Sequence, residues 1–312
     1  MEQADAPNDP AVMPQSESTL AGRGSIASGN DMELIQVSAD PRCFVVRIAD
    51  LDQPVRRIFP MSRLIEAIGS KEMGLVAPQL WEDPREDQPA LCMLDGRGHV
   101  EGKGQRPLSA YLAPAWAQCW SLNPGSDTLL RAYSQVRLDE KSRCNMVPEH
   151  EGVTVTTTVR HLLAAASAWH ADGADGHVVI GRVEYLPDKD IGQRIVNACN
   201  GKHGPGFFCS VQGRADSLMW KRDFFEHERE VRLLLIDRSW KRDNPAPKVR
   251  PVRIDPNALF TSISFDPRLQ DGEANDRAAV FRDAGYTGDI VRDHSYQKQL
   301  YLLAMMRDWP DP

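Results

Sequence analysis

The 312-residue sequence lacks the cysteine and apolar patterns that mark secreted and membrane proteins. Its six cysteines are scattered, with no C-x-x-C pair, which is typical of free thiols in a reducing compartment rather than of a disulfide framework or a zinc site. No apolar run reaches the ~18 residues of a membrane-spanning helix. The N-terminal residues show neither the basic nor the apolar region of a secretion signal. We therefore expect a cytoplasmic protein with no membrane partner.

Several catalytic motifs are also absent from the sequence. There is no G-x-S-x-G, no H-E-x-x-H and no H-x-E with P-C-x-x-C, so common hydrolase, metalloprotease and deaminase chemistries lose support. The glycine-rich stretch 95–104 does not have the G-x-x-x-x-G-K-[ST] order that holds phosphates. The net charge of -7 disfavours non-specific binding to nucleic acid, which needs a basic field. We expect no required cofactor.

What the sequence does contain is an ordinary globular composition, with 41% hydrophobic and 26% charged residues. Residues 1–32 are an exception, because they are rich in Pro, Ser, Gly, Asn and Asp and show no apolar periodicity. Such a segment buries too little surface to offset its ordering entropy. We predict a disordered tail over 1–32 and a single domain over 33–312.

Short β-branched runs alternate irregularly with a few helical patterns after the tail. Strands are predicted at 43–48, 73–78, 116–122, 152–159, 177–186, 230–236, 248–256, 259–267 and 288–294. Helices are predicted at 61–70, 126–135, 160–171 and 273–285. We expect Gly69 to end the first helix and Ser62 to cap it, and Ser126 or Asp127 to cap the second. More strands than helices, without regular alternation, predict an α+β domain with a mixed, mainly antiparallel sheet flanked by a few helices.

The stretch 217–236 contains four basic side chains, one histidine and four carboxylates, and it ends in the apolar run of strand 230–236. The stretch RDFFEHERE forms either one or two helical turns or an extended chain. If it is extended from Glu228, then Glu228, Glu230 and Arg232 point to one face. Two close carboxylates raise each other's pKa, which suits general acid or base catalysis. The alternative is a salt-bridge cluster at the rim of the sheet, with Arg232 neutralising Glu230.

Candidate binding residues occur in two other segments. In CWSLNPGSDTLLRAYS, Arg131 and Tyr133 either grip an anionic ligand or serve as a surface arginine and core aromatic. Asp83 precedes Pro84 and is held in an extended or turn conformation, for a structural or a functional reason. Four basic residues would extend an anion pocket if the fold gathers them: Lys221, Arg222, Arg232 and Arg268.

A metal site at HADGADGH is a further option, because His170, Asp172, Asp175 and His177 fall within eight residues. The spacing matches no metal-binding loop, and glycine with aspartate is what a loop from a helix to a strand normally uses. We therefore predict no metal there.

The order of several blocks resembles the bacterial family called domain of unknown function 2971. These blocks are RRIFPMSRLIEAI, LVAPQLWEDPRE, AQCWSLNPGSDTLLRAYSQ, GVTVTTTVRHL, LMWKRDFFEHEREVRLL, RIDPNALFTSISFDPRL and GYTGDIVRDHSY, which span residues 55–296 approximately. The F-x-H-E-x-E-V-R-L and DPR blocks are the most specific. Leu130 stands where the family pattern W-R-x-Y-S has tryptophan. The resemblance implies an intracellular effector or toxin role in bacterial conflict or phage defence.

A second analogy concerns three residues taken in chain order. Arg57 on an early strand, Ser121 on a middle strand and Glu228 and Glu230 before a late strand follow the order of Arg-Ser-Glu ADP-ribosyltransferases. In that chemistry the arginine holds a phosphate of NAD, the serine positions the glutamate or the ribose, and the glutamate stabilises oxocarbenium-like charge.

Two functions of different classes follow. In the enzyme hypothesis Glu230 is the catalytic carboxylate, Glu228 the second acid, Arg57 and Ser121 lie in the pocket, and NAD is the substrate. In the binding hypothesis the pocket senses a nucleotide or an acidic partner segment without turnover, and Glu228 and Glu230 orient Arg232 and Lys221 by salt bridges.

Overall fold

The computed structural model describes residues 34–36, 40–95, 104–171, 176–239, 246–297, 300–302 and 304. The predicted tail, 1–32, lies outside these residues. The described part of the chain is α+β, with a mixed, mainly antiparallel sheet, as the sequence predicts. None of its helices is long and apolar enough to cross a membrane.

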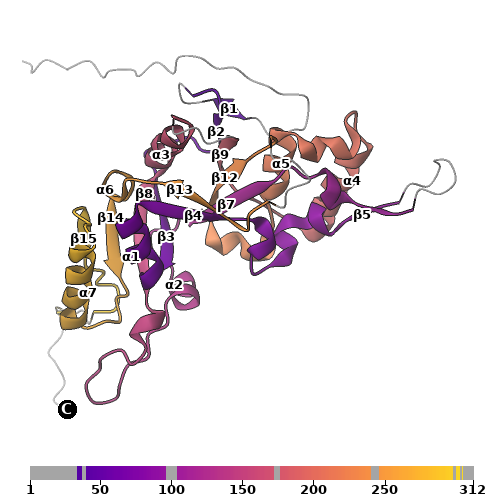
Figure 1. Ribbon diagram of the computed structural model, residues 1–312. Helices are drawn as coiled ribbons and strands as arrows, with labels where there is room; N and C mark the ends of the chain where they lie inside the picture. The colour runs from indigo at the N-terminus through magenta and orange to yellow at the C-terminus, as the bar shows by residue number, and fades with distance from the viewer. Residues whose placement is uncertain are drawn as a thin grey trace, which may run out of the picture.

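An 11-stranded sheet forms the centre of the described residues (Figure 1). Its strands follow the order β1 (Ile35–Gln36), β2 (Cys43–Val46), β9 (His177–Arg182), β12 (Glu230–Ile236), β7 (Ala115–Ser121), β3 (Pro54–Pro60), β8 (Gly152–Thr158), β14 (Ser262–Phe265) and β15 (Asp289–Val291). Two further strands, β4 (Glu72–Val76) and β13 (Val249–Arg253), attach to β7 through β4. The pairings β2–β9 and β14–β15 are parallel.

The sheet is divided between β7 and β3. Val76 of β4 pairs with Ala117 near the start of β7, whereas β3 pairs with β7 at a single described position, Arg56 with Ser121 at the end of β7. The carbonyl of Cys119, between these points, accepts a hydrogen bond of 2.6 Å from Arg57 Nη1. A side chain thus supplies the donor that a neighbouring strand would otherwise provide, because a buried carbonyl needs a partner.

The two faces of β12 differ because successive side chains of a strand alternate. Val231, Leu233 and Leu235 point into the main core, which helices α1 (Met61–Ser70) and α3 (Val159–Ala171) cover. On the opposite face Leu234 and Ile236 pack with helix α5 (Val211–Leu218). Glu230 and Arg232 continue that second face, where the strand begins.

The remaining elements lie around the sheet. The other helices are α2 (Asp127–Tyr133), α4 (Asp188–Asn200), α6 (Pro256–Leu259) and α7 (Asp271–Asp283). Two small sheets pair β10 (Glu184–Leu186) with β11 (Trp220–Arg222) and β5 (Met93–Leu94) with β6 (Arg106–Pro107). The 3-10 helices are η1 (Pro78–Leu80), η2 (Pro84–Leu91), η3 (Leu108–Tyr111), η4 (Pro148–His150), η5 (Gly204–Cys209) and η6 (Asp223–Glu228). Figure 1 shows α7, β14 and β15 at one end of the molecule and α4 and β5 at the other.

Most predicted elements are confirmed, and the exceptions are the following. The predicted strand 177–186 is two strands, because Glu184 leaves the main sheet and pairs with Trp220. Gly69 lies inside α1, which ends one residue later with Lys71 in the left-handed region at φ 56°. Pro60, not Ser62, precedes α1 and no side chain caps it. Ser126 caps α2, accepting from the amide of Leu129 at 3.3 Å. Helices α4, α5 and α6 were not predicted, and α6 lies where the predicted strands 248–256 and 259–267 adjoin.

Candidate functional site

A cleft of about 810 Å³ opens on the face of the sheet that carries Glu230. Strands β3 and β7, the turn η6 before β12, helix α2 and the segment 293–296 contribute to its walls. This volume lies within the range of ~300–1,000 Å³ that small-molecule sites occupy. The cleft is thus large enough for a nucleotide-sized ligand.

Three polar residues form a row on neighbouring strands at the cleft. Arg56 of β3 is the cross-strand partner of Ser121 of β7, and Ser121 is the partner of Glu230 of β12. All three line the cleft. Arg56 makes no side-chain hydrogen bond or ion pair with any residue that the structure describes, and burial lowers its pKa. The row places an unpaired guanidinium, a hydroxyl and a carboxylate side by side.

The carboxylate of Glu230 is buried and bound by two cations, Arg232 and Lys221. Its Oε1 accepts from Arg232 Nε at 2.7 Å, and its Oε2 accepts from Lys221 Nζ at 3.0 Å and from Arg232 Nη2 at 3.1 Å. Burial raises the pKa of Glu230, but Arg232 and Lys221 outweigh it and lower the pKa to about 2. The expectation of a raised pKa, from the nearness of Glu228, is therefore wrong for Glu230. This carboxylate is ionised at neutral pH and suits the stabilisation of positive charge better than proton transfer.

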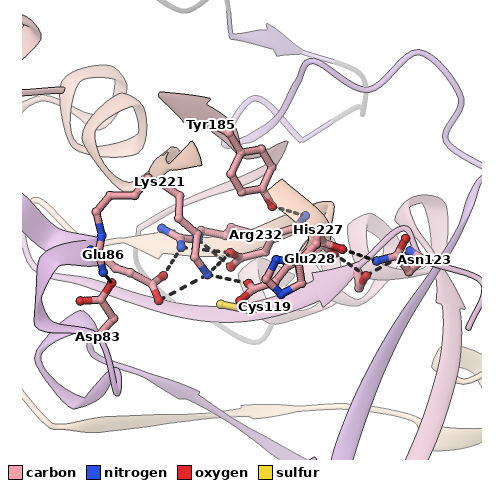
Figure 2. A network of polar contacts seen from close by, with 12 residues as sticks. Asp83, Glu86, Cys119, Asn123, Tyr185, Lys221, His227, Glu228 and Arg232 are labelled. Carbon is pink, nitrogen blue, oxygen red and sulfur yellow. Dashed lines mark hydrogen bonds and ion pairs between the residues drawn. The ribbon is translucent and has the colours of Figure 1, made fainter. Parts of the chain in front are cut away.

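Lys221 joins three carboxylates into one network. Its Nζ lies 2.6 Å from Glu228 Oε2 and 3.4 Å from Glu86 Oε1, in addition to its contact with Glu230. Figure 2 shows its amine pointing between Glu86 and Glu228. Burial alone would lower the pKa of Lys221, but the three carboxylates raise it, so the amine stays charged.

Arg232 is fully buried, and each part of its guanidinium has a partner. It binds Glu86 as well as Glu230, donates from Nη1 to the carbonyl of Leu218 at 2.6 Å, and lies 4.5 Å from the centroid of the Trp81 ring. Burial raises the pKa of Glu86, although Arg232 opposes this. Charged groups removed from water in this way are tolerated because each is paired and hydrogen-bonded.

Glu228 is held by the backbone geometry of the turn before β12. The segment forms the 3-10 helix η6, Arg229 adopts the left-handed region at φ 47°, and the strand begins at Glu230. Ser121 Oγ donates to the carbonyl of Glu228 at 2.6 Å, and Asn123 Nδ2 donates to that of His227 at 2.6 Å. The side chain of Glu228 is 20% exposed against 3% for Glu230. Glu228 is thus the carboxylate of the pair that a ligand in the cleft reaches more easily.

The other basic residues do not gather into one anion pocket, because each binds a carboxylate of its own. Arg131 pairs with Asp127 at 2.7 Å, Arg268 with Asp266 at 2.6 Å and Arg222 with Asp83 at 2.6 Å. Asp83 also accepts from the amide of Arg85 at 3.0 Å and caps η2.

Only some of the site residues predicted from the sequence line the cleft. Its lining includes Glu228, Glu230, Ser121, Arg57, Lys221 and Tyr133. Asp83, Arg131, Arg232 and Arg268 are not part of that lining. Asp172 and Asp175 of the HADGADGH segment lie outside the described residues.

Three residues of the site were missed in the sequence. Arg56 stands beside Arg57, and no local pattern says which of the two shares a row with Ser121. Glu86 and Trp81 reach the network from a segment more than a hundred residues away in the chain. Strand pairing places Arg56, and tertiary contacts of the segment around η2 place Glu86 and Trp81.

No family model matches the chain, and no curated protein does. Among solved structures, Thermus sp. 2.9 DarT in complex with ADP-ribosylated ssDNA is similar at a TM-score of 0.31 and 11% identity, over 79% of this chain and 97% of that chain. The complex of the same protein with carba-NAD+ gives a TM-score of 0.31 at 10% identity, over 77% of this chain and 95% of that chain. Its complex with NAD+ gives a TM-score of 0.30 at 12% identity, over 78% of this chain and 98% of that chain. Similarity at this level assigns neither fold nor function to this chain.

Proposed function

We propose that the cleft binds a dinucleotide of the NAD type and that the chain is an ADP-ribosyltransferase-like or NAD-hydrolysing enzyme. The observation that carries the proposal is the row Arg56–Ser121–Glu230, in register on three neighbouring strands. An arginine, a serine and a glutamate on an early, a middle and a late strand are the set that this chemistry uses. The resemblance to the domain of unknown function 2971 family supports a role as a conflict or defence effector.

The arginines are suited to the pyrophosphate of such a ligand. Arg56 has no anionic partner among the described residues, and Arg57 Nε is buried without one. Guanidinium groups bind phosphate oxygens in a bidentate manner. A bound pyrophosphate would therefore neutralise Arg56 and complete the hydrogen bonding of Arg57.

The carboxylates are suited to the ribose next to the bond that breaks. Cleavage of the bond between nicotinamide and ribose sends the bonding electrons to nicotinamide and leaves oxocarbenium-like charge on the ribose. The ionised Glu230 stabilises that charge, and the more exposed Glu228 accepts a hydrogen bond from a ribose hydroxyl. Water or an acceptor nucleophile then forms the new bond to the anomeric carbon and releases its proton to Glu228 or solvent. Ser121 acts through the backbone of Glu228 as a positioning residue.

The test is nicotinamide release from labelled NAD, with cell lysate as the source of acceptor. Wild-type protein should release nicotinamide, and Glu228→Gln and Arg56→Gln should each lose most of that activity while keeping the melting temperature. Glu66→Gln and Arg63→Gln are matched controls, because these residues form an exposed ion pair on α1. Absence of release from the wild type, or full activity in Glu228→Gln, would contradict the enzyme proposal.

A second candidate function is nucleotide binding without turnover. It is favoured by one observation: both oxygens of Glu230 are already taken by Arg232 and Lys221. In that case Glu230 holds the two cations in place and contributes to stability only. Glu230→Gln would then lower the melting temperature and weaken nucleotide binding together, whereas in an enzyme the loss of turnover would exceed the loss of binding. Equilibrium dialysis with NAD beside the release assay separates the two.

A further inference from the structure

A second cluster of chemically active side chains lies away from the cleft. Asp40 precedes β2, Cys43 is the first residue of β2, and His170 lies in the last turn of α3. Strand β9 separates β2 from β12, so the cluster is independent of the carboxylate network. We propose that Asp40, Cys43 and His170 form a binding site for a divalent transition metal of the zinc class.

The donor atoms are close enough to share one ion. His170 Nδ1 lies 2.7 Å from Asp40 Oδ2 and 3.8 Å from Cys43 Sγ, and the three atoms all lie within 4.8 Å of one another. Zinc binds sulfur at ~2.3 Å and nitrogen or oxygen at ~2.0–2.2 Å in a tetrahedral arrangement, which separates its ligand atoms by roughly 3.3–3.7 Å. The 3.8 Å between Cys43 Sγ and His170 Nδ1 lies just above this range. The Asp40 carboxylate is now hydrogen-bonded to His170 at 2.7 Å, and Oδ2 must move slightly away from Nδ1 for both atoms to bind one ion.

The donor set decides the class of metal. Thiolate and imidazole select zinc, cobalt or iron over magnesium and calcium, which prefer oxygen ligands. A thiolate and a carboxylate together carry two negative charges, which balance a divalent cation while the imidazole remains neutral. This balance matters because Cys43 is fully buried and the His170 side chain is 1% exposed. An unbalanced charge at that depth would be strongly unfavourable.

The surroundings orient the ligands as an outer shell does. Asp40 Oδ1 accepts from the Arg42 amide at 2.9 Å and from Arg42 Nε at 3.3 Å, while Oδ2 is the oxygen turned to His170. Such contacts fix the direction of a coordinating carboxylate. The described residues supply three ligands, so the fourth position is left for water or another donor. A bound ion would connect β2, near one edge of the sheet, to α3.

The test uses the full chain stripped with a chelator and titrated with Co²⁺, which reports thiolate ligation by a charge-transfer absorption band. We expect one cobalt per chain, displacement by zinc, and loss of the band in Cys43→Ser. Cys144→Ser is the matched control, because Cys144 is an exposed free thiol, and it should keep the band.

His170→Asn is a second variant that separates coordination from packing. The asparagine amide can keep the hydrogen bond to Asp40 but is a poor ligand for zinc. Zinc should raise the melting temperature of the stripped wild type and leave that of His170→Asn unchanged. No cobalt band, a band that persists in Cys43→Ser, or one that disappears in Cys144→Ser would overturn the proposal, the last by showing adventitious binding at the surface.

Discussion

The two faces of strand β12 differ in chemistry over the first half of the strand. One face presents Val231, Leu233 and Leu235 to the main hydrophobic core. The other begins with Glu230 and Arg232, both buried, before it becomes apolar. Buried ion pairs add little net stability compared with apolar side chains of similar volume. The difference teaches that the first face holds the fold together, whereas the second places charge beside a cleft.

The largest expected effect comes from breaking the charged face. Arg232→Met should lower the free energy of unfolding by about 3–5 kcal/mol, because it leaves Glu230 and Glu86 buried with fewer cationic partners. Urea denaturation measures this change. Adding Glu230→Met to Arg232→Met should recover part of the loss, since the uncompensated carboxylate is then gone. A single variant that costs less than ~1 kcal/mol would show that water reaches this network.

A substitution on the apolar face should lower stability through lost packing and not through an unpaired charge. Leu233→Ala should cost ~3 kcal/mol through lost burial and the cavity that remains. Leu233 is fully buried in the main core. Since no charge is involved, the cost should be the same in low and high salt, and a cost that changes strongly with salt would contradict this assignment.

Lowering the pH should destabilise the protein through the charged face, because the pKa of Glu230 is lowered in the folded state. The pKa of Glu230 lies at about 2 in the folded protein, below its usual value of 4.5. A depressed pKa stabilises the folded state above pH 4.5, and this contribution is lost as the pH falls towards 2. The melting temperature of the wild type should therefore decline over that interval. The melting temperature should fall less in Glu230→Gln than in the wild type, and it should fall by the same amount in Leu233→Ala as in the wild type. Equal falls in all three proteins would contradict the lowered pKa of Glu230.

The smallest effect is expected outside both faces. Glu66→Gln removes an exposed ion pair of 2.8 Å with Arg63 on α1, and such pairs contribute ~0.2–1 kcal/mol. Its melting temperature should nearly equal that of the wild type. A large loss would mean that charges far from the network are coupled to it.

Whether a part of the fold or of the site could be predicted depends on how far apart in the sequence its contacting residues lie. Strand β12 and the charge before it could be read locally, because a run of apolar residues and the alternation of side chains are properties of neighbouring positions. The partners of Lys221 at Glu228 and Glu230 are close in sequence and were proposed as a salt-bridge cluster. Glu86, Trp81 and Arg56 come from distant segments, and no local pattern sets their register.

The separate pairing of Arg131, Arg222 and Arg268 has this origin only for Arg222, because its partner Asp83 is distant in the chain. Each was a candidate for an anion pocket from its residue type alone. Arg131 and Arg268 instead bind Asp127 and Asp266, which are four and two positions away in the sequence, so these two ion pairs are local.

The division of the sheet between β3 and β7 has a consequence for how the protein opens. One hydrogen-bonded ladder runs from β1 to β7 and includes β4 and β13, and the other runs from β3 to β15. In the described part of the chain their backbones pair only at Arg56 and Ser121, beside the side-chain hydrogen bond from Arg57 to Cys119. Units joined so sparsely are expected to exchange their amide hydrogens with separate opening free energies. A ligand that touches both Arg56 and Glu230 would span this junction. Its binding would slow exchange in both ladders at once and make them unfold as one cooperative unit.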